Sequence, residues 1–184
     1  MTLALPLLQS WLPTPEDGFL PGTAKISWGD GMLHLWADLI DNDVITTATA
    51  HGQRLWEHGD VAELFIQKEG ESGYREYQVS PNGFTLALHY PDITCIADVR
   101  SGKKPMEVFL TQEIPVMEVS KTTAGWSLSL RVPLPASPGE IFRVSCCRYD
   151  AGSGRPPVIS STSPHPVRDF HRPQDWREFV PVAG

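Results

Sequence analysis

The stretch AKISWGDGMLHLWADLI, residues 24–40, carries the signal that decides the fold. Apolar and polar residues alternate in two runs, 24–28 and 32–40, on either side of a Gly-Asp-Gly tripeptide. Alternation with a period of two is typical of a strand with one buried face, and an Asp-Gly pair between two such runs is a strong hairpin signal. The stretch therefore predicts an antiparallel β-hairpin.

Similar short runs continue along the chain and predict an all-β fold. Further strands are expected at residues 61–67, 74–80, 84–90, 108–114, 125–132, 141–149 and 175–180, and residues 151–172 are expected to form a loop. The tripeptide Pro81-Asn82-Gly83 predicts a second hairpin turn. Long amphipathic helices between the strands are missing from the pattern, which disfavours βαβ folds. About nine short strands in 184 residues predict one domain, residues 1–184, built as a two-sheet antiparallel β-sandwich of jelly-roll or immunoglobulin-like type.

Composition and charge narrow the choice of partners. The chain has 15 Lys and Arg against 22 Asp and Glu, a formal net charge of -7, and no basic stripe. Binding to nucleic acid or to an anionic membrane needs clustered cations, so neither is expected as a partner. A neutral ligand or a protein partner fits the charge.

The cysteines and the first residues bear on the cellular compartment. Cys95, Cys146 and Cys147 do not make a disulfide framework, because neighbouring strand residues point to opposite faces. Free thiols favour a reducing compartment. The apolar start, residues 1–15, has no cationic segment and is interrupted by Pro6. The expectation is a cytoplasmic protein without a secretory signal, or a secreted protein if a signal has been removed.

Glu63 is the residue most indicative of a site. It interrupts the run VAELFI, residues 61–66, which is apolar on both faces and therefore typical of a central strand covered on both sides. A buried carboxylate is costly unless it is paired or hydrogen-bonded. One interpretation is an ion pair with an arginine, for which Arg131, Arg143 and Arg148 are candidates. The other places Glu63 at a cleft, where it binds a ligand.

Two loops add candidate residues. Trp56 lies in the polar segment 51–60, where its ring either stacks on the apolar face of a sugar or folds back onto the core. The segment SSTSPHPVRDFHR, residues 160–172, concentrates hydroxyl groups, histidines and charges, and loops often carry function. The tryptophans in strand-like runs are expected in the core: Trp28, Trp36, Trp126 and Trp176.

Catalytic and metal-binding patterns are sparse. The sequence has no nucleophile elbow, phosphate-binding glycine loop or zinc motif, so no catalytic residue and no cofactor are expected. Glycoside hydrolysis by paired carboxylates stays open, with Glu63 and one of Asp60, Glu57 or Glu76. Calcium is a minor candidate, with oxygen ligands from Asp38, Asp41, Asn42, Asp43 and Asp60. Axial haem ligation, another alternative, has candidates but no pattern that selects a pair: Met32, Met106, Met117, His34 and His89.

Three stretches together carry a resemblance to a known family. They are WEHGDVAELFIQ at residues 56–67, YREYQVSPNG at residues 74–83 and FHRPQDW at residues 170–176. Their order is similar to that of family 9 carbohydrate-binding modules, in which a Trp-Glu segment runs into an apolar strand, an aromatic-rich strand enters a Ser-Pro-x-Gly turn, and an aromatic loop ends the domain. The resemblance covers roughly residues 20–180.

The resemblance implies a β-sandwich that holds a sugar between two aromatic rings. Trp56 matches the first stacking tryptophan, Glu63 a carboxylate that binds sugar hydroxyls, and Ser145 a polar strand residue that contacts ligand. Two positions depart from the family, Gln78 where it can place an arginine and Phe170 near its second tryptophan. His171 and Arg172 complete the expected site.

The leading hypothesis is therefore a non-catalytic carbohydrate-binding domain, in which Trp56 and Phe170 face one another across a cleft with Glu63 and Gln78 on its floor. Two alternatives remain, a hydrolase with paired carboxylates and an interaction module without a small ligand.

Overall fold

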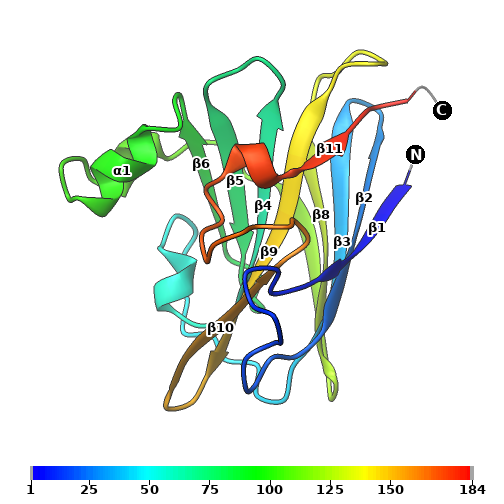
Figure 1. The fold of residues 1–184 in the computed structure, drawn as a ribbon. Coiled ribbons are helices and arrows are strands. Elements are labelled where there is room, and N and C mark those ends of the chain that lie inside the picture. Colours follow the sequence, from blue (N-terminus) through cyan, green and yellow to red (C-terminus); the bar gives the residue numbers. More distant parts are fainter. Residues whose placement is uncertain (1, 183–184) are drawn as a thin grey trace.

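A computed structural model describes residues 2–182, which form a sandwich of two antiparallel sheets (Figure 1). One sheet has the order β1-β2-β3-β8-β7, and the other has the order β10-β9-β4-β5-β6, with β11 paired to β9. The strands are β1 (Thr2–Leu7), β2 (Gly22–Gly29), β3 (Met32–Ile40), β4 (Val61–Lys68), β5 (Tyr74–Val79), β6 (Thr85–Tyr90), β7 (Val116–Thr122), β8 (Gly125–Pro133), β9 (Phe142–Gly152), β10 (Arg155–Ser161) and β11 (Arg177–Phe179). The predicted fold class is confirmed.

The hairpin that decided the prediction forms where it was expected. Strands β2 and β3 pair in register from Gly22 opposite Leu39 to Gly29 opposite Met32. The two turn residues between them, Asp30 and Gly31, have φ of 53° and 73°. Both central residues of a tight hairpin turn need this left-handed region, which Asp tolerates and Gly adopts at no steric cost.

The main core lies between the two sheets. Its residues alternate along each strand: β3 contributes Leu33, Leu35, Ala37 and Leu39, while β4 contributes Ala62, Leu64 and Ile66, all buried. A strand with one covered face needs apolar residues only at every second position. The other residues of β3 therefore face outward from the five-stranded sheet.

A second apolar cluster covers the outer face of the six-stranded sheet. Val61 and Phe65 of β4 point away from the main core and pack with residues from loops, among them Leu55 and Trp176. This explains why β4 is apolar on both faces. Cys146 lies in the main core and Cys147 in the second cluster, so the two neighbours point apart as predicted, and all three cysteines are free thiols.

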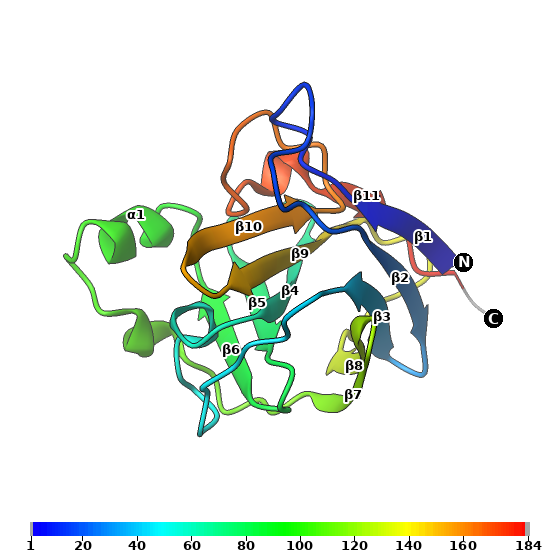
Figure 2. The ribbon, with the colours of Figure 1, turned by 90° about the horizontal axis from the view of Figure 1, so that it is seen from below.

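Three segments build this outer layer, and Figures 1 and 2 show them beside the six-stranded sheet. The first contains a short 3₁₀ helix at Leu55–Glu57, and the second contains helix α1 (Cys95–Arg100) with a 3₁₀ helix at Met106–Phe109. The third is the late loop, residues 163–176, which ends in a 3₁₀ helix at Pro173–Asp175. None of the described helices is long and apolar enough to cross a membrane.

Three strands differ from the sequence-based expectation. Strand β1 occupies the apolar start at the edge of its sheet, where Pro6 is tolerated because an edge strand need not donate every hydrogen bond. Strand β10 crosses the segment expected to be loop, and a register shift between Arg155 and Val158 accommodates its two prolines. The strand expected at residues 108–114 is wrong: it begins after Pro115, as β7.

Candidate functional site

A cleft of about 250 Å³ opens in the outer layer of the six-stranded sheet. Its floor comes from β4 and β5, and its walls and rim come from the three covering segments and from β6, β9 and β10. The floor residues are polar, namely Glu63, Glu76 and Gln78, whereas the aromatic wall residues are Trp56, Tyr90, Tyr149 and Phe170. Four further polar residues line the cleft: Arg100, Arg168, Asp169 and His171.

Strand register brings the three floor residues together. Glu63 of β4 lies opposite Gln78 of β5, and Glu76 lies two residues before Gln78 on the same face. Gln78 Nε2 donates a hydrogen bond of 2.6 Å to Glu76 Oε1. Glu76 Oε2 and Gln78 Oε1 are buried and have no hydrogen-bond partner among the described residues. An unsatisfied buried polar atom costs about 1–3 kcal/mol, so a ligand that donates hydrogen bonds here would recover that free energy.

The environment of the floor shifts the two carboxyl groups toward their neutral forms. Burial raises the pKa of Glu76 from 4.5 to about 7, although the hydrogen bond from Gln78 acts in the opposite direction. Burial and the nearby charge of Glu76 raise the pKa of Glu63 well above its usual range. A carboxyl group in its neutral form donates as well as accepts a hydrogen bond. The floor thus offers both kinds of partner to a hydroxyl group.

The two interpretations of Glu63 are separated by the structure. Glu63 is only 3% exposed and lines the cleft. The candidate partners lie elsewhere: Arg148 pairs with Asp41 and Asp150, and Arg143 pairs with Glu69 and Glu178. Arg131 lies on the other sheet, and Glu63 has no ion pair within residues 2–182, so the ion-pair interpretation is wrong. Glu63 lies in a cleft, and its contact with a ligand stays a prediction.

The aromatic walls differ from the predicted clamp. Trp56 is half-buried and lines the cleft as expected. Phe170 also lines it but is only 4% exposed, with its ring centroid 5.8 Å from that of Tyr149 and 6.4 Å from that of Phe65. The Phe170 carbonyl accepts a 2.8 Å hydrogen bond from the indole N–H of Trp176, which holds this part of the loop against the sheet. Phe170 thus forms an apolar wall of the cleft. The expectation that Trp56 and Phe170 form a pair of open stacking rings is wrong.

A network of polar groups fixes the rim. Arg100 of α1 makes two hydrogen bonds, of 2.7 and 3.1 Å, to the Asp169 carboxylate, which accepts a third from the His171 backbone N–H. The His171 ring lies 2.6 Å, Nδ1 to Oη, from the Tyr74 hydroxyl. Burial and the charge of Arg100 lower the pKa of His171 to about 3, so its imidazole is neutral near pH 7. The rim carries its positive charge on arginine rather than histidine.

Two expected site residues lie outside the cleft. Ser145 is fully buried, and its hydroxyl is hydrogen-bonded to Ser163 at 2.8 Å and Ser161 at 3.0 Å. It lies opposite Phe65 on the outer face of the sheet, where Ser163 of the late loop covers it. The Arg172 guanidinium pairs with Asp175 and does not line the cleft. Neither residue can contact a ligand there.

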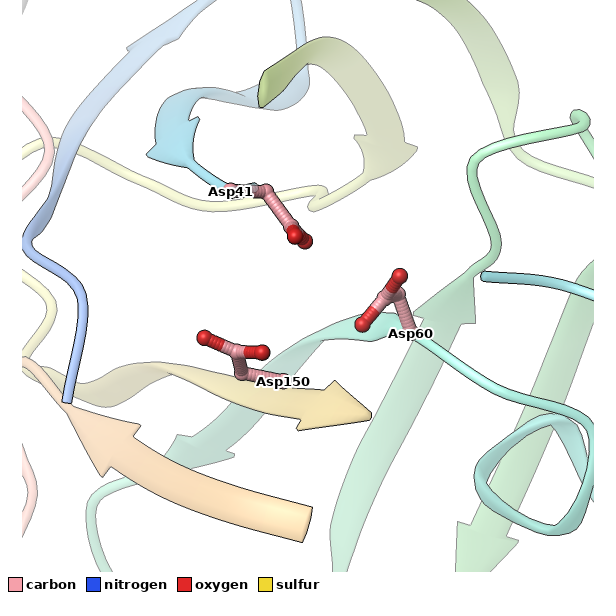
Figure 3. A group of neighbouring side chains, drawn as sticks. All are labelled: Asp41, Asp60 and Asp150. Atoms are coloured by element: carbon pink, nitrogen blue, oxygen red, sulfur yellow. The ribbon is translucent and has the colours of Figure 1, made fainter. Parts of the chain in front are cut away.

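The acidic residues considered for calcium separate into two groups. Asp38 is exposed on β3, and Asn42 and Asp43 are exposed in the following turn. By contrast, Asp41 and Asp60 gather with Asp150, and Figure 3 shows their carboxylates pointing toward one another.

The Arg148 guanidinium already pairs with this carboxylate cluster. Arg148 Nη2 lies 3.0 Å from Asp41 Oδ2 and 3.1 Å from Asp150 Oδ2. Asp60 accepts backbone hydrogen bonds from Ile45 and Ala151, and burial raises its pKa to about 7. Calcium stays a prediction, and the ion would compete with Arg148 for these carboxylates.

The fold can now be compared with known proteins. No protein-family model matches the sequence, and no curated protein matches it either. Among solved structures, a Bacteroides uniformis protein provisionally described as carbohydrate-binding matches with a TM-score of 0.67 at 16% identity, over 97% of this chain and 85% of that chain.

Two structures of a family 9 module from Caldicellulosiruptor kristjanssonii also match. The complex with cellotriose has a TM-score of 0.64, and the complex with glucose has 0.62, both at 14% identity. Each match covers 94% of this chain, and 79% or 80% of the module. The chain has the fold of family 9 carbohydrate-binding modules. At this identity the likeness establishes the family 9 fold, and it confirms the resemblance that the three sequence stretches carried.

Several cleft residues were not expected from the sequence. Glu76 was considered only as a catalytic partner of Glu63, Tyr90 and Tyr149 were not singled out, and Asp169 was expected only as one residue of the late loop. Arg100 was missed because helix α1 was not predicted. Alternation from Gln78 back to Glu76 could have identified the second carboxyl group, since residues two apart on a strand share a face.

Proposed function

We propose that the chain binds a carbohydrate in the cleft above the six-stranded sheet and does not alter it chemically. The observation that carries the proposal is the floor, where two buried acceptor atoms, on Glu76 and Gln78, have no partner among the described residues. They lie in the same cleft as Glu63 and the half-buried ring of Trp56. Hydroxyl groups would satisfy the polar floor, and the apolar face of a sugar ring would pack against the indole.

The size and charge of the cleft limit the classes of ligand that it can bind. Its volume of about 250 Å³ is below the ~300–1,000 Å³ of pockets that take drug-sized molecules. A single sugar unit or the end of a chain fits this space better than a long segment. Raised carboxyl pKa values and the Arg100–Asp169 pair limit the net charge of the cleft, and Arg168 adds one positive charge, a balance that is compatible with a neutral sugar. Glucose and cellotriose, bound by the fold neighbours, are reasonable first probes.

Calorimetric titration with neutral mono- and disaccharides tests the proposal. We expect saturable binding by the wild type and at least a tenfold loss of affinity, about 1.4 kcal/mol, in Trp56→Ala and in Glu63→Gln. Ile114→Ala is the matched control, because it removes an exposed apolar side chain that lines neither the cleft nor any other described hollow of the sheets. Equal affinity in Trp56→Ala and wild type would contradict the cleft site. Heat from none of the sugars would favour the interaction-module hypothesis instead.

Glycoside hydrolysis remains a second candidate because one observation favours it. Two carboxyl groups, Glu63 and Glu76, line the same cleft with raised pKa values, and a general acid needs such a shift. Incubation of the protein with cello- and xylo-oligosaccharides, followed by measurement of reducing ends, distinguishes the two functions. Unchanged oligosaccharide, under conditions where calorimetry shows binding, supports the non-catalytic proposal. Release of reducing ends that Glu63→Gln abolishes would replace it with hydrolysis.

A further inference from the structure

The outer face of the five-stranded sheet forms a second, more open site. A hollow of about 600 Å³ extends over strands β1, β2, β3, β7 and β8. An adjoining hollow of about 330 Å³ shares Trp36, Glu118 and Ser129 with it. The two together make a long shallow surface with these three residues at its centre. This surface belongs to the other sheet and shares no residue with the cleft.

Trp36 is the aromatic platform of this surface. The sequence analysis expected it in the core, but the side chain is 39% exposed because it stands at an outward position of β3, the middle strand of the sheet. Its cross-strand neighbours are Lys25 on β2 and Ser129 on β8. The His34 ring lies 5.6 Å from the indole, centroid to centroid, on one side, and the flexible lysine and the small serine leave the rest of the ring open to a ligand.

Small hydroxyl side chains surround the ring. The outward positions beside Trp36 include Ser27 on β2, Ser127 and Ser129 on β8, and Ser120 on β7, all of which line the larger hollow. Low side chains around one large ring create the depression, and they present hydroxyl groups at its base.

The charges of the surface are balanced and unpaired. Lys25 and Arg131 contribute two positive charges, and Asp38 and Glu118 contribute two negative charges. None of the four belongs to an ion pair within residues 2–182. A polyanion such as nucleic acid needs an excess of cations, which this face lacks. A neutral ligand rich in hydroxyl groups can use charged donors and acceptors of both signs.

We infer that this outer face binds an internal segment of a neutral polysaccharide, with one sugar ring stacked on Trp36. An open surface admits a chain that continues in both directions, whereas the cleft encloses its ligand. The Trp36 platform thus gives the protein a second carbohydrate site with a different preference. The inference depends on this face alone, and it holds whether or not the cleft binds sugar.

Affinity electrophoresis of the whole protein through gels containing neutral polysaccharides tests the second site. The probes are mixed-linkage β-glucan, arabinoxylan, glucomannan and galactomannan. We expect at least one polysaccharide to retard the wild type, and Trp36→Ala to lose at least nine-tenths of that retardation. Trp36→Phe, which keeps a smaller ring, is expected to retain part of it. Since Trp36 is exposed, the variants should fold, and circular dichroism checks this.

Two matched controls keep the outcomes separable. Ile40→Ala removes an exposed apolar side chain from the same strand outside both hollows, and should be retarded like the wild type. Trp56→Ala alters only the cleft, so retardation that it alone abolishes would assign polysaccharide binding to the cleft and overturn the inference. Equal retardation of Trp36→Ala and the wild type, or retardation by none of the four polysaccharides, would overturn it as well. A self-associated wild type that Trp36→Ala converts to monomer would make this face a protein interface instead.

Discussion

The outer faces of the two sheets differ, because one is covered by loops and a helix and the other is exposed to solvent. On the six-stranded sheet, loops and α1 cover the outer face and enclose Phe65, Phe170 and the carboxyl groups of a narrow cleft. On the five-stranded sheet, serines and unpaired charges surround an exposed tryptophan. Equivalent strand positions therefore have different surroundings, because only one of the sheets has an outer layer.

The sequences of the strands account for this difference. Strand β3 alternates between buried and outward positions, and its outward side chains lie at least partly in solvent, whereas β4 is apolar and buried at Val61 and Phe65 as well as on its inner face. A carboxyl group outward on β4 is consequently desolvated, whereas Asp38, outward on β3, is solvated. Polar residues on a covered face are the better candidates for an enclosed ligand, and a lone aromatic residue on an uncovered face is the better candidate for an open platform.

The largest effect is expected where the ends of the two sheets meet. Asp41 follows β3, Asp150 belongs to β9, and Arg148 pairs with both. Arg148→Met leaves the buried Asp41 without its cation and Asp150 with Arg155 alone, which we expect to lower the free energy of unfolding by about 3–5 kcal/mol. Urea denaturation followed by tryptophan fluorescence measures the change.

Arg155→Met is the matched control for that substitution. Arg155 also pairs with Asp150 but is partly exposed, and such pairs contribute only about 0–1 kcal/mol. A similar loss in both variants would mean that Arg148 does not hold the sheets together in any special way. The same variants test calcium: an ion at Asp41, Asp60 and Asp150 should stabilise Arg148→Met more than the wild type.

A smaller, pH-dependent effect is expected on the covered face. The pKa of Glu76 is raised from 4.5 to about 7. Its stabilising contribution is therefore fully present below pH 4.5 and is lost as the pH rises through about 7. Glu76→Gln mimics the neutral carboxyl group, so we expect it to be more stable than the wild type at pH 8, by up to a few kcal/mol at about 1.4 kcal/mol per unit of pKa.

Thermal denaturation at pH 4.5, 6 and 8 follows this difference, which should vanish at the lowest pH. Glu118→Gln is the control, because it makes the same change at an exposed position of the open face. Parallel profiles for Glu76→Gln and the wild type would show that the covered face does not hold Glu76 in its neutral form.

Local patterns made most of the fold predictable. Alternation and the Asp-Gly turn located β2 and β3, and the doubly apolar run located β4 and placed Glu63 at a covered face. Strand β10 and helix α1 escaped because prolines and a length of six residues mask their periodicity. The cleft was less predictable, since Arg100 reaches it from that helix, and Phe170 was expected to be open. The burial of a loop residue depends on contacts such as the hydrogen bond between the Phe170 carbonyl and Trp176. The local sequence pattern does not predict such contacts.

The smallest effect is expected at Trp36, and it gives the sharpest comparison between the two faces. Trp36→Ala removes a ring that is 39% exposed and outside both apolar clusters, so the free energy of unfolding should change by no more than about 0.5 kcal/mol. Phe170→Ala removes a buried ring from the second cluster and should cost about 3–5 kcal/mol. Urea denaturation of both variants measures the contrast. A loss of 2 kcal/mol or more (roughly what truncation of a buried side chain costs) in Trp36→Ala would mean that the indole is covered in solution. The open face would then be a packed one, and the distinction between the two sheets would not hold.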